Sequence, residues 1–197
     1  MPGKNLITSP RRSRSKESKS EQYTSRYLLA HFQKLSNLER DLDRLPSDKE
    51  HFFLHTDKSF NGFTFIAFVA KTLPIKKMYA STYSLSVKVI EAFIEMVDRG
   101  AIEELVLVIS DSMLKRNPKA MEHLRGLAAS RGNVKIQFAW IHAKVSLLKT
   151  DNGHFIIEGS GNFSENASIE QYLFANDYDL FRFRESMFND LEVRHEF

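Results

Sequence analysis

The residues of this chain best suited to chemistry are His142 and Lys144, separated by one position and followed by the motif Gly159-Ser160-Gly161-Asn162. An imidazole can attack phosphorus or transfer a proton, while an ammonium and a carboxamide can hold phosphate oxygens. Glycines on both sides of Ser160 would let backbone N–H groups approach an anion closely. These residue types predict a phosphate-handling site in which lysine supplies the positive charge, without a metal ion.

The sequence around the two motifs predicts a β-hairpin that brings them together. Residues 134–140 alternate as a strand does, and we expect a second strand that begins at His142 and carries Lys144 on the same face. Side chains two positions apart on a strand are separated by about 6.5–7 Å. Residues 151–153 are a turn signal, and residues 154–158 predict the returning strand. Ser160 would then lie beside the start of the strand that carries the histidine.

With the motifs in this order, the sequence resembles the phospholipase D superfamily, whose signature is HxKxxxxD, then GSxN, then a later Glu or Asp. The resemblance implies an α/β fold with a layered mixed β-sheet flanked by helices, in which a β-hairpin carries the HxK and GSxN motifs. It also implies phosphodiester cleavage through a phosphohistidine intermediate, without a cofactor. The matching catalytic positions are His142, Lys144, Asn162 and, as the candidate for the later carboxylate, Glu170; those for phosphate binding are Lys144, Ser160 and Asn162.

Two features depart from the family pattern. Lys149 occupies the position of the signature aspartate, and Asp151 comes two residues later. The hairpin is longer than the common form, and the segment from Asn162 to Glu170 is correspondingly shorter. In the family this aspartate is mainly structural, so the resemblance implies that its loss affects the scaffold more than the chemistry.

The mechanism implied by the resemblance needs two histidines, one to attack phosphorus and one to protonate the leaving oxygen. The chain has one matching motif, since the segment from His55 to Lys58 is one residue too long to be a second copy. Single-motif members of the family solve this as homodimers. We therefore expect a homodimer that brings two copies of His142 to a two-fold axis.

Positive charge is concentrated at the start of the chain. Residues 1–20 carry six Lys and Arg against one Glu, whereas the rest of the 197 residues carry 22 basic and 24 acidic side chains. We expect residues 1–21 to be a disordered basic tail that contacts nucleic acid or an anionic membrane surface, or a leader without such a role. No stretch reaches transmembrane length, and the absence of cysteine excludes disulfides and fits a cytoplasmic protein.

The rest of the sequence predicts a helical arm followed by one α/β domain. Residues 22–48 form the arm, with a helix over Gln22–Arg44 that either packs on the domain or contacts a second copy. Residues 49–197 form the phospholipase D-like domain. Its expected strands and helices alternate, which favours a layered sheet, over His51–Thr56, Gly62–Leu73, Met78–Tyr83, Ser86–Arg99, Leu105–Ser110, Pro118–Ser130, Val134–Trp140 and finally the helix Asp179–Glu192.

Several other residues have an ordinary structural interpretation. Four histidines lie in no metal-ligand spacing and are expected at the surface or in packing: His55, His123, His154 and His195. The hydroxyl residues Ser81, Thr82 and Ser84 follow a predicted strand, where α/β sheets commonly place ligands. Trp140 and Phe163 are either a pocket wall or core, and we expect core.

Three functions fit these observations. The leading hypothesis is a metal-independent phosphodiesterase, a nuclease that acts on DNA or RNA, because the family's small single-motif members resemble this class and the tail is basic. The second is a catalytically weak binding or structural protein with the same fold, motivated by Lys149 in the aspartate position. The third is a lipid phosphodiesterase, for which no amphipathic interfacial helix is evident.

Overall fold

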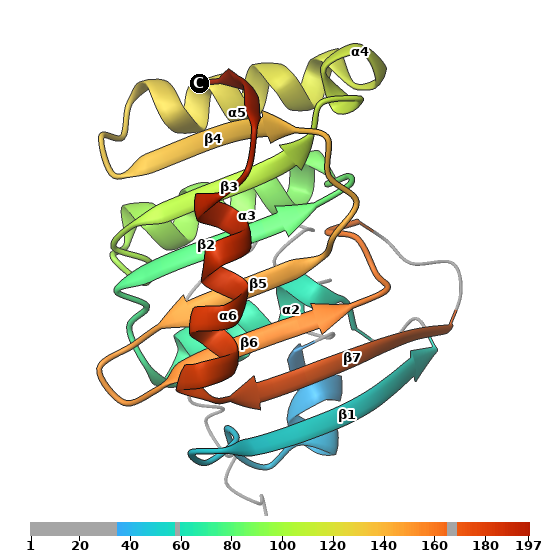
Figure 1. The fold of residues 1–197 in the computed structure, drawn as a ribbon, viewed down its shortest axis with the longest axis vertical. Helices are drawn as coiled ribbons and strands as arrows, with labels where there is room; N and C mark the ends of the chain where they lie inside the picture. Colours follow the sequence, from blue (N-terminus) through green and yellow to red (C-terminus); the bar gives the residue numbers. More distant parts are fainter. Residues whose placement is uncertain (1–34, 58–59, 165–168) are drawn as a thin grey trace, which may run out of the picture.

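An eight-stranded mixed β-sheet organises the chain, with strand order β1-β7-β6-β5-β2-β3-β4-β8 (Figure 1). The computed structural model describes residues 35–57, 60–164 and 169–197, so the basic tail and residues 22–34 of the helical arm lie outside the described residues. The strands are β1 Glu50–Asp57, β2 Lys77–Thr82, β3 Leu105–Ser110, β4 Val134–Ala139, β5 Val145–Lys149, β6 His154–Gly159, β7 Ile169–Asn176 and β8 Val193–Glu196.

The sheet has a parallel half and an antiparallel half. Strands β2, β3 and β4 run parallel, joined by helical crossovers, whereas β5, β6, β7 and β1 pair antiparallel. The two halves meet where β2 pairs antiparallel with β5, in the register Ser81 to Val145. The parallel strands therefore end on the side of the sheet where β5 begins, which is the right-hand side in Figure 1.

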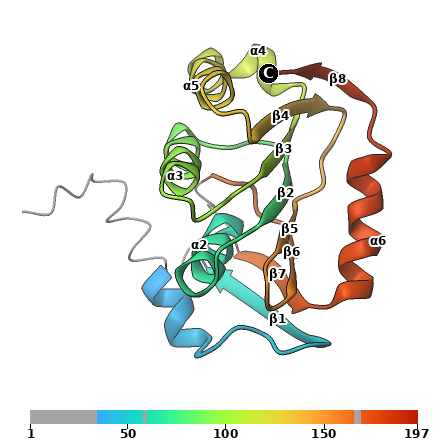
Figure 2. The same cartoon turned by 90° about the vertical axis from the view of Figure 1, so that its left-hand side faces the viewer.

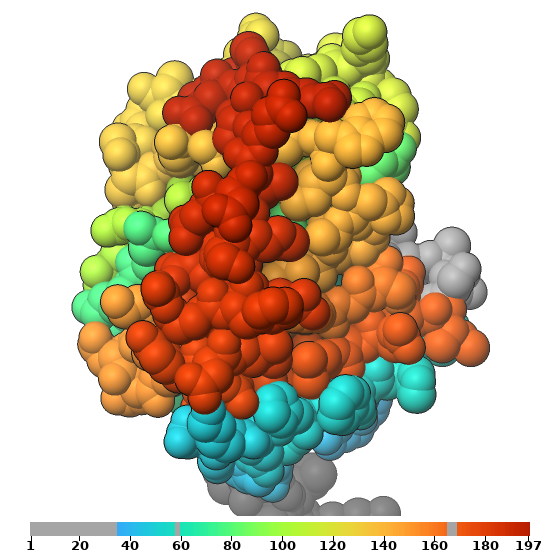
Figure 3. All heavy atoms as spheres, viewed as in Figure 1, coloured from blue at the N-terminus to red at the C-terminus, as the bar shows by residue number. Residues whose placement is uncertain are grey.

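Helices cover both faces of the sheet. Figure 2 shows α2, α3 and α5 on one face and α6 alone on the other. In the space-filling view α6 crosses the strands, and parts of the β5–β6 hairpin emerge on either side of it (Figure 3). The helices are α2 Gly62–Thr72, α3 Val87–Asp98, α4 Met113–Arg116, α5 Pro118–Ala129 and α6 Tyr178–Asn189.

The larger core lies under α2, α3 and α5 and is rich in aromatic rings. Phe65 packs against Phe60 and Phe174 with ring centroids 5.4 and 5.3 Å apart, and all three side chains are buried. Residues 35–41 are helical, and Leu38 from this segment is fully buried in the same core. Within the described part of the arm, this burial favours packing on the domain.

The structure confirms the expected layered α/β sheet, and each helix and strand expected between His51 and Trp140 is present within two residues at either end. The last helix ends at Asn189, before the expected Glu192, and β8 follows it. Sequence reasoning also missed β7, which fills the sheet between β1 and β6.

Two expectations around the first motif are wrong. The second strand begins at Val145 rather than His142, because the Val145 N–H donates to the side-chain oxygen of Ser81 at 3.2 Å. Before it, Lys144 keeps a bond to β6, from the Gly159 N–H to its own carbonyl oxygen at 3.2 Å. Trp140 does not lie in the core, since 78% of the residue is exposed beyond the end of β4. Phe163, in contrast, is buried as expected.

Candidate active site

His142 and Lys144 lie between β4 and β5, and their side chains meet. Lys144 Nζ is 3.2 Å from His142 Nδ1 and donates to the His142 carbonyl oxygen at 2.8 Å. Because an ammonium can only donate, Nδ1 acts as the acceptor, and the neutral ring then carries its hydrogen on Nε2. His142 is exposed, whereas Lys144 is half-buried. The predicted pair is thus together just before β5, and the Lys144 carbonyl oxygen accepts from the Gly159 N–H of β6 at 3.2 Å.

Tyr83 supports this pair from the end of β2. Its ring centroid lies 4.7 Å from that of His142, and Lys144 Nζ lies 5.9 Å from the Tyr83 centroid. Sequence reasoning missed Tyr83 and noted only its hydroxyl neighbours. Tyr83 could have been found from its position, because an aromatic residue directly after a strand lies at the edge of the sheet where ligands commonly bind.

Ser160 and Glu170 face each other across the ends of β6 and β7. Ser160 Oγ donates a hydrogen bond to Glu170 Oε2 and accepts one from the Gln171 N–H at 3.1 Å. A side chain at Gly159 would place Cβ 2.6 Å from the Gln171 carbonyl oxygen, so this close approach of the two strands requires glycine. The Glu170 carboxylate therefore bonds Ser160, and no hydrogen bond joins it to the His142 ring.

Asn162 lies beside the end of β2. Thr82 Oγ1 donates to the Ser84 carbonyl oxygen at 2.8 Å, accepts from the Phe163 N–H at 3.3 Å, and lies 3.4 Å from Asn162 Oδ1. The Phe163 carbonyl oxygen accepts from the N–H of Ser86, which caps α3. Thr82, one of the hydroxyl residues noted in the sequence, thus positions the GSxN loop.

An electrostatic interaction connects Lys144 of the first motif with Glu170 on β7. Burial lowers the pKa of Lys144 below the ordinary value of 10.5, while the nearby charge of Glu170 acts in the opposite direction. The carboxylate on β7 is therefore within electrostatic reach of the lysine beside His142. The structure gathers four predicted residues, His142, Lys144, Ser160 and Glu170, around one end of the sheet, and places Asn162, in the loop after β6, beside the end of β2.

The residues that depart from the family signature lie at the opposite end of β5. Lys149 is the last residue of β5 and pairs with His154. Asp151 is in the turn, with 75% of its side chain exposed, 3.8 Å from Lys76. The lysine in the aspartate position is thus separated from Lys144 by the length of the strand.

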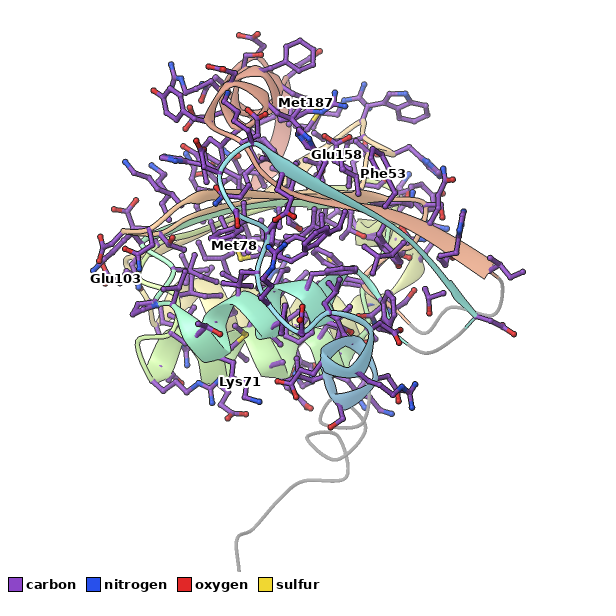
Figure 4. All side chains as sticks on the ribbon, turned by 90° about the horizontal axis from the view of Figure 1, so that it is seen from below. Phe53, Lys71, Met78, Glu103, Glu158 and Met187 are labelled. Carbon is purple, nitrogen blue, oxygen red and sulfur yellow. The ribbon has the colours of Figure 1, made fainter. Side chains whose placement is uncertain are left out.

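A hollow of about 640 Å³ lies on the face that carries α6. Figure 4 shows Phe53, Glu158 and Met187 gathered there, on the opposite side of the sheet from Lys71. Phe53 is 82% exposed, and Glu158 is paired with Arg184. Lys144 also contributes to the lining, so the hollow approaches the site from the α6 side.

The remaining histidines have no shared cluster. His154 packs against the rings of Tyr178 and Phe181, at 4.9 and 5.1 Å, and His195 packs against Phe138. Within residues 35–57, 60–164 and 169–197, no group of three or more His, Cys, Asp or Glu residues could hold a metal ion. No helix in these same ranges has the length and apolar character needed to cross a membrane.

The same fold occurs in several solved structures. Polyphosphate kinase from Porphyromonas gingivalis matches with a TM-score of 0.57 and 12% identity, over 72% of this chain and 26% of that chain. NucT from Helicobacter pylori matches with a TM-score of 0.53 and 16% identity, over 72% of this chain and 96% of NucT. Phosphatidylserine synthase from Haemophilus influenzae Rd KW20 matches with a TM-score of 0.51 and 11% identity, over 73% and 39%.

These matches define the class of the fold. The chain has the phospholipase D-like fold, as its two motifs predict. It spans about a quarter of the polyphosphate kinase chain but nearly all of NucT. No family model matches the sequence, and no curated protein matches it. The structural matches are below 25% identity and concern the fold alone.

Proposed function

We propose that the protein is a metal-independent phosphodiesterase, specifically a nuclease that cleaves DNA or RNA through a phosphohistidine as a homodimer. The observation that carries this proposal is the contact of Lys144 with His142, beside Ser160 and Glu170, on a phospholipase D-like fold. Two of the structural neighbours are named for phosphate compounds, a polyphosphate kinase and a phosphatidylserine synthase. A cytoplasmic location stays a prediction.

In the first step His142 Nε2 attacks phosphorus, a P–N bond forms, and the bond to the leaving oxygen breaks. The leaving oxygen takes a proton from a second histidine. In the second step that histidine accepts a proton from water, the water oxygen attacks phosphorus, and the P–N bond breaks. Splitting one displacement into two lowers each barrier, while Lys144 and Asn162 stabilise charge on the phosphate oxygens.

The tautomer of His142 must change before it can attack. Lys144 donates to Nδ1, which leaves the hydrogen of the neutral ring on Nε2. A bound phosphate would attract the Lys144 ammonium away from Nδ1. The charge of Glu170 already acts on Lys144. We propose that Glu170 then accepts a hydrogen bond from the Nδ1–H group of His142 and stabilises the imidazolium.

The second histidine is proposed to be His142 of another copy, and Trp140 is the residue we expect at that interface. It is 78% exposed two positions from His142, and the Arg194 guanidinium lies 5.5 Å from its ring centroid. Trp140→Ala should weaken the dimer by about 2 kcal/mol, since exposed tryptophans often anchor interfaces. Light scattering against concentration would measure this, and Phe183→Ala, which removes a 65% exposed ring from α6, is the matched control.

A subunit-exchange experiment tests the shared site directly. Mixing wild type with His142→Ala protein should give mixed dimers without activity, because each site needs both histidines. Wild-type protein that scatters as a monomer, or that retains full specific activity after exchange, would contradict the dimer.

The basic tail lies outside the described residues, and its role rests on its charge. Removing residues 1–20 takes away a net charge of +5 from six basic and one acidic side chains. Nucleic-acid binding should weaken, and its dependence on the logarithm of salt concentration should flatten, while cleavage of a small phosphodiester stays unchanged. An unchanged salt slope would show that the tail is not a nucleic-acid arm.

The binding-module alternative has its own supporting observation. Ser160 donates a hydrogen bond to Glu170, and Lys144 donates one to Nδ1 of His142. These four side chains therefore bond one another rather than a substrate. Lipid phosphodiesterase activity is the third candidate. One assay separates the three: the purified protein, with EDTA present, on single- and double-stranded DNA, RNA, phospholipid vesicles and bis(p-nitrophenyl) phosphate. A folded dimer that cleaves none of these would support the binding module.

A further inference from the structure

Arg116 stacks on the ring that supports the candidate nucleophile. Its guanidinium carbon lies 4.6 Å from the centroid of Tyr83, the same ring whose centroid is 4.7 Å from that of His142. Lys144 Nζ is 5.9 Å from this centroid. Two cations and the histidine are therefore arranged around one tyrosine at the carboxyl end of β2.

The guanidinium is fixed by Ser112 rather than by a carboxylate. Arg116 Nη2 donates to Ser112 Oγ at 2.7 Å, and Nε donates to the Ser112 carbonyl oxygen at 3.3 Å. Ser112 Oγ is in turn 2.8 Å from Ser110 Oγ, at the end of β3. These bonds hold the arginine in place and leave the Nη1 group and one Nη2 hydrogen for another acceptor.

Most of the arginines that the structure describes are paired with a carboxylate, and Arg116 is not. Arg116 and Arg125 form no ion pair with a described carboxylate, and Arg125 stacks on Phe197 at 4.9 Å, away from the site. The others each have an acidic partner within 4 Å: Arg40, Arg44, Arg99, Arg131, Arg182, Arg184 and Arg194. Arg116 thus keeps its full charge available to an external anion, next to the site.

We propose that Arg116 binds the phosphate adjacent to the scissile one, so that the site takes a polynucleotide strand rather than a single phosphate ester. The proposed role of Arg116 rests on the proposed nuclease function and specifies its substrate as a polynucleotide strand. Arg116 and His142 lie 4.6 and 4.7 Å from the centroid of the same Tyr83 ring, so a strand whose scissile phosphate is at His142 can place the adjacent phosphate within reach of the arginine. The forked donors of arginine fit phosphate oxygens, and Arg116 is exposed and able to reach them.

The test compares Arg116→Ala with Arg125→Ala on two substrates. Arg125→Ala removes the same charge, also from an arginine stacked on an aromatic ring, and is the matched control. Arg116→Ala should lower kcat/KM on a short single-stranded oligonucleotide about tenfold, and leave kcat/KM on bis(p-nitrophenyl) phosphate unchanged. Arg125→Ala should change neither.

Binding supplies a second readout that does not depend on turnover. In His142→Asn protein, adding Arg116→Ala should reduce the slope of log Kd against log salt for a labelled oligonucleotide by about one, as expected for one lost phosphate contact. Arg116→Lys keeps the charge and should keep the slope. If wild type cleaves no phosphodiester, the nuclease proposal fails, yet this slope still decides whether Arg116 binds the strand.

Three results would overturn the inference. Equal losses on the oligonucleotide and on bis(p-nitrophenyl) phosphate would mean that Arg116 acts at the scissile phosphate or positions His142 through Tyr83. An unchanged salt slope would mean that it meets no phosphate. Dissociation of the Arg116→Ala protein into monomers in light scattering would place the residue in the contact between copies.

Discussion

Replacing His142 with asparagine should abolish cleavage of every phosphodiester the protein accepts, by about 10⁴-fold or more, because no other group can form the covalent intermediate. The protein should stay folded, since His142 is exposed and the strand begins only at Val145. Wild-type activity should survive EDTA, because lysine meets the phosphate charge. Initial rates with and without chelator, and a thermal melt of the variant, measure these effects.

His123→Asn is the matched control, since it makes the same substitution on α5, away from the site. It should leave the rate unchanged. A wild-type enzyme that is silenced by EDTA, or a His142→Asn protein that cleaves as fast as wild type, would refute the proposed mechanism.

Replacing Lys144 with alanine should lower turnover by about 10³-fold, because the variant lacks the preorganised donor that meets charge on the phosphate oxygens. Asp151→Ala should leave turnover unchanged and cost less than about 1 kcal/mol of stability, as its ion pair with Lys76 is exposed and 3.8 Å long. Steady-state kinetics and chemical unfolding of the two variants separate chemistry from scaffold. A large loss of turnover in Asp151→Ala would show that the turn of the hairpin influences the site.

The charge state of Lys144 makes the activity depend on pH. Burial lowers the pKa of Lys144 below 10.5, so its ammonium is lost at a lower pH than that of an ordinary lysine, and activity should fall as the pH rises through the lowered value. Glu170 raises this pKa, so Glu170→Gln should lower it further. Titration of the lysine by NMR checks both directions without relying on turnover, and an upward shift in Glu170→Gln would contradict the arrangement.

Local patterns in the sequence were sufficient for most of the sheet. Residues 105–109 are all apolar because the strand is covered on both faces. Asn61, which caps α2, and Pro118, at the first position of α5, are residue types that suit helix starts. β8 could not be predicted, since its four residues are exposed and carry no periodic pattern, and only pairing with β4 makes them a strand. β7 did alternate, with Tyr172 and Phe174 facing the core, and was overlooked beside the motif.

The site was less accessible to sequence reasoning than the fold. His142, Lys144, Ser160 and Asn162 could be chosen from residue types and spacing, but their contacts depend on where strands stop. β5 begins only at Val145, so residues 142–144 precede the strand, and the Lys144 side chain turns onto His142. Tyr83 contacts both Arg116 and His142, so three segments that are distant in sequence come together at one ring. No local sequence pattern predicts such a contact.

The bond between Ser160 and Glu170 has a consequence for how such sites diversify. The pairing of Gly159 with Tyr172 sets the separation of the two residues, so it does not depend on how many residues connect Asn162 to Glu170. Insertions and deletions in that connection can accumulate without moving the carboxylate. A sequence motif with a fixed number of residues between GSxN and the acidic residue would then miss sites of this kind. A structural criterion, which requires the serine and the carboxylate to be neighbours on paired strands, would find them.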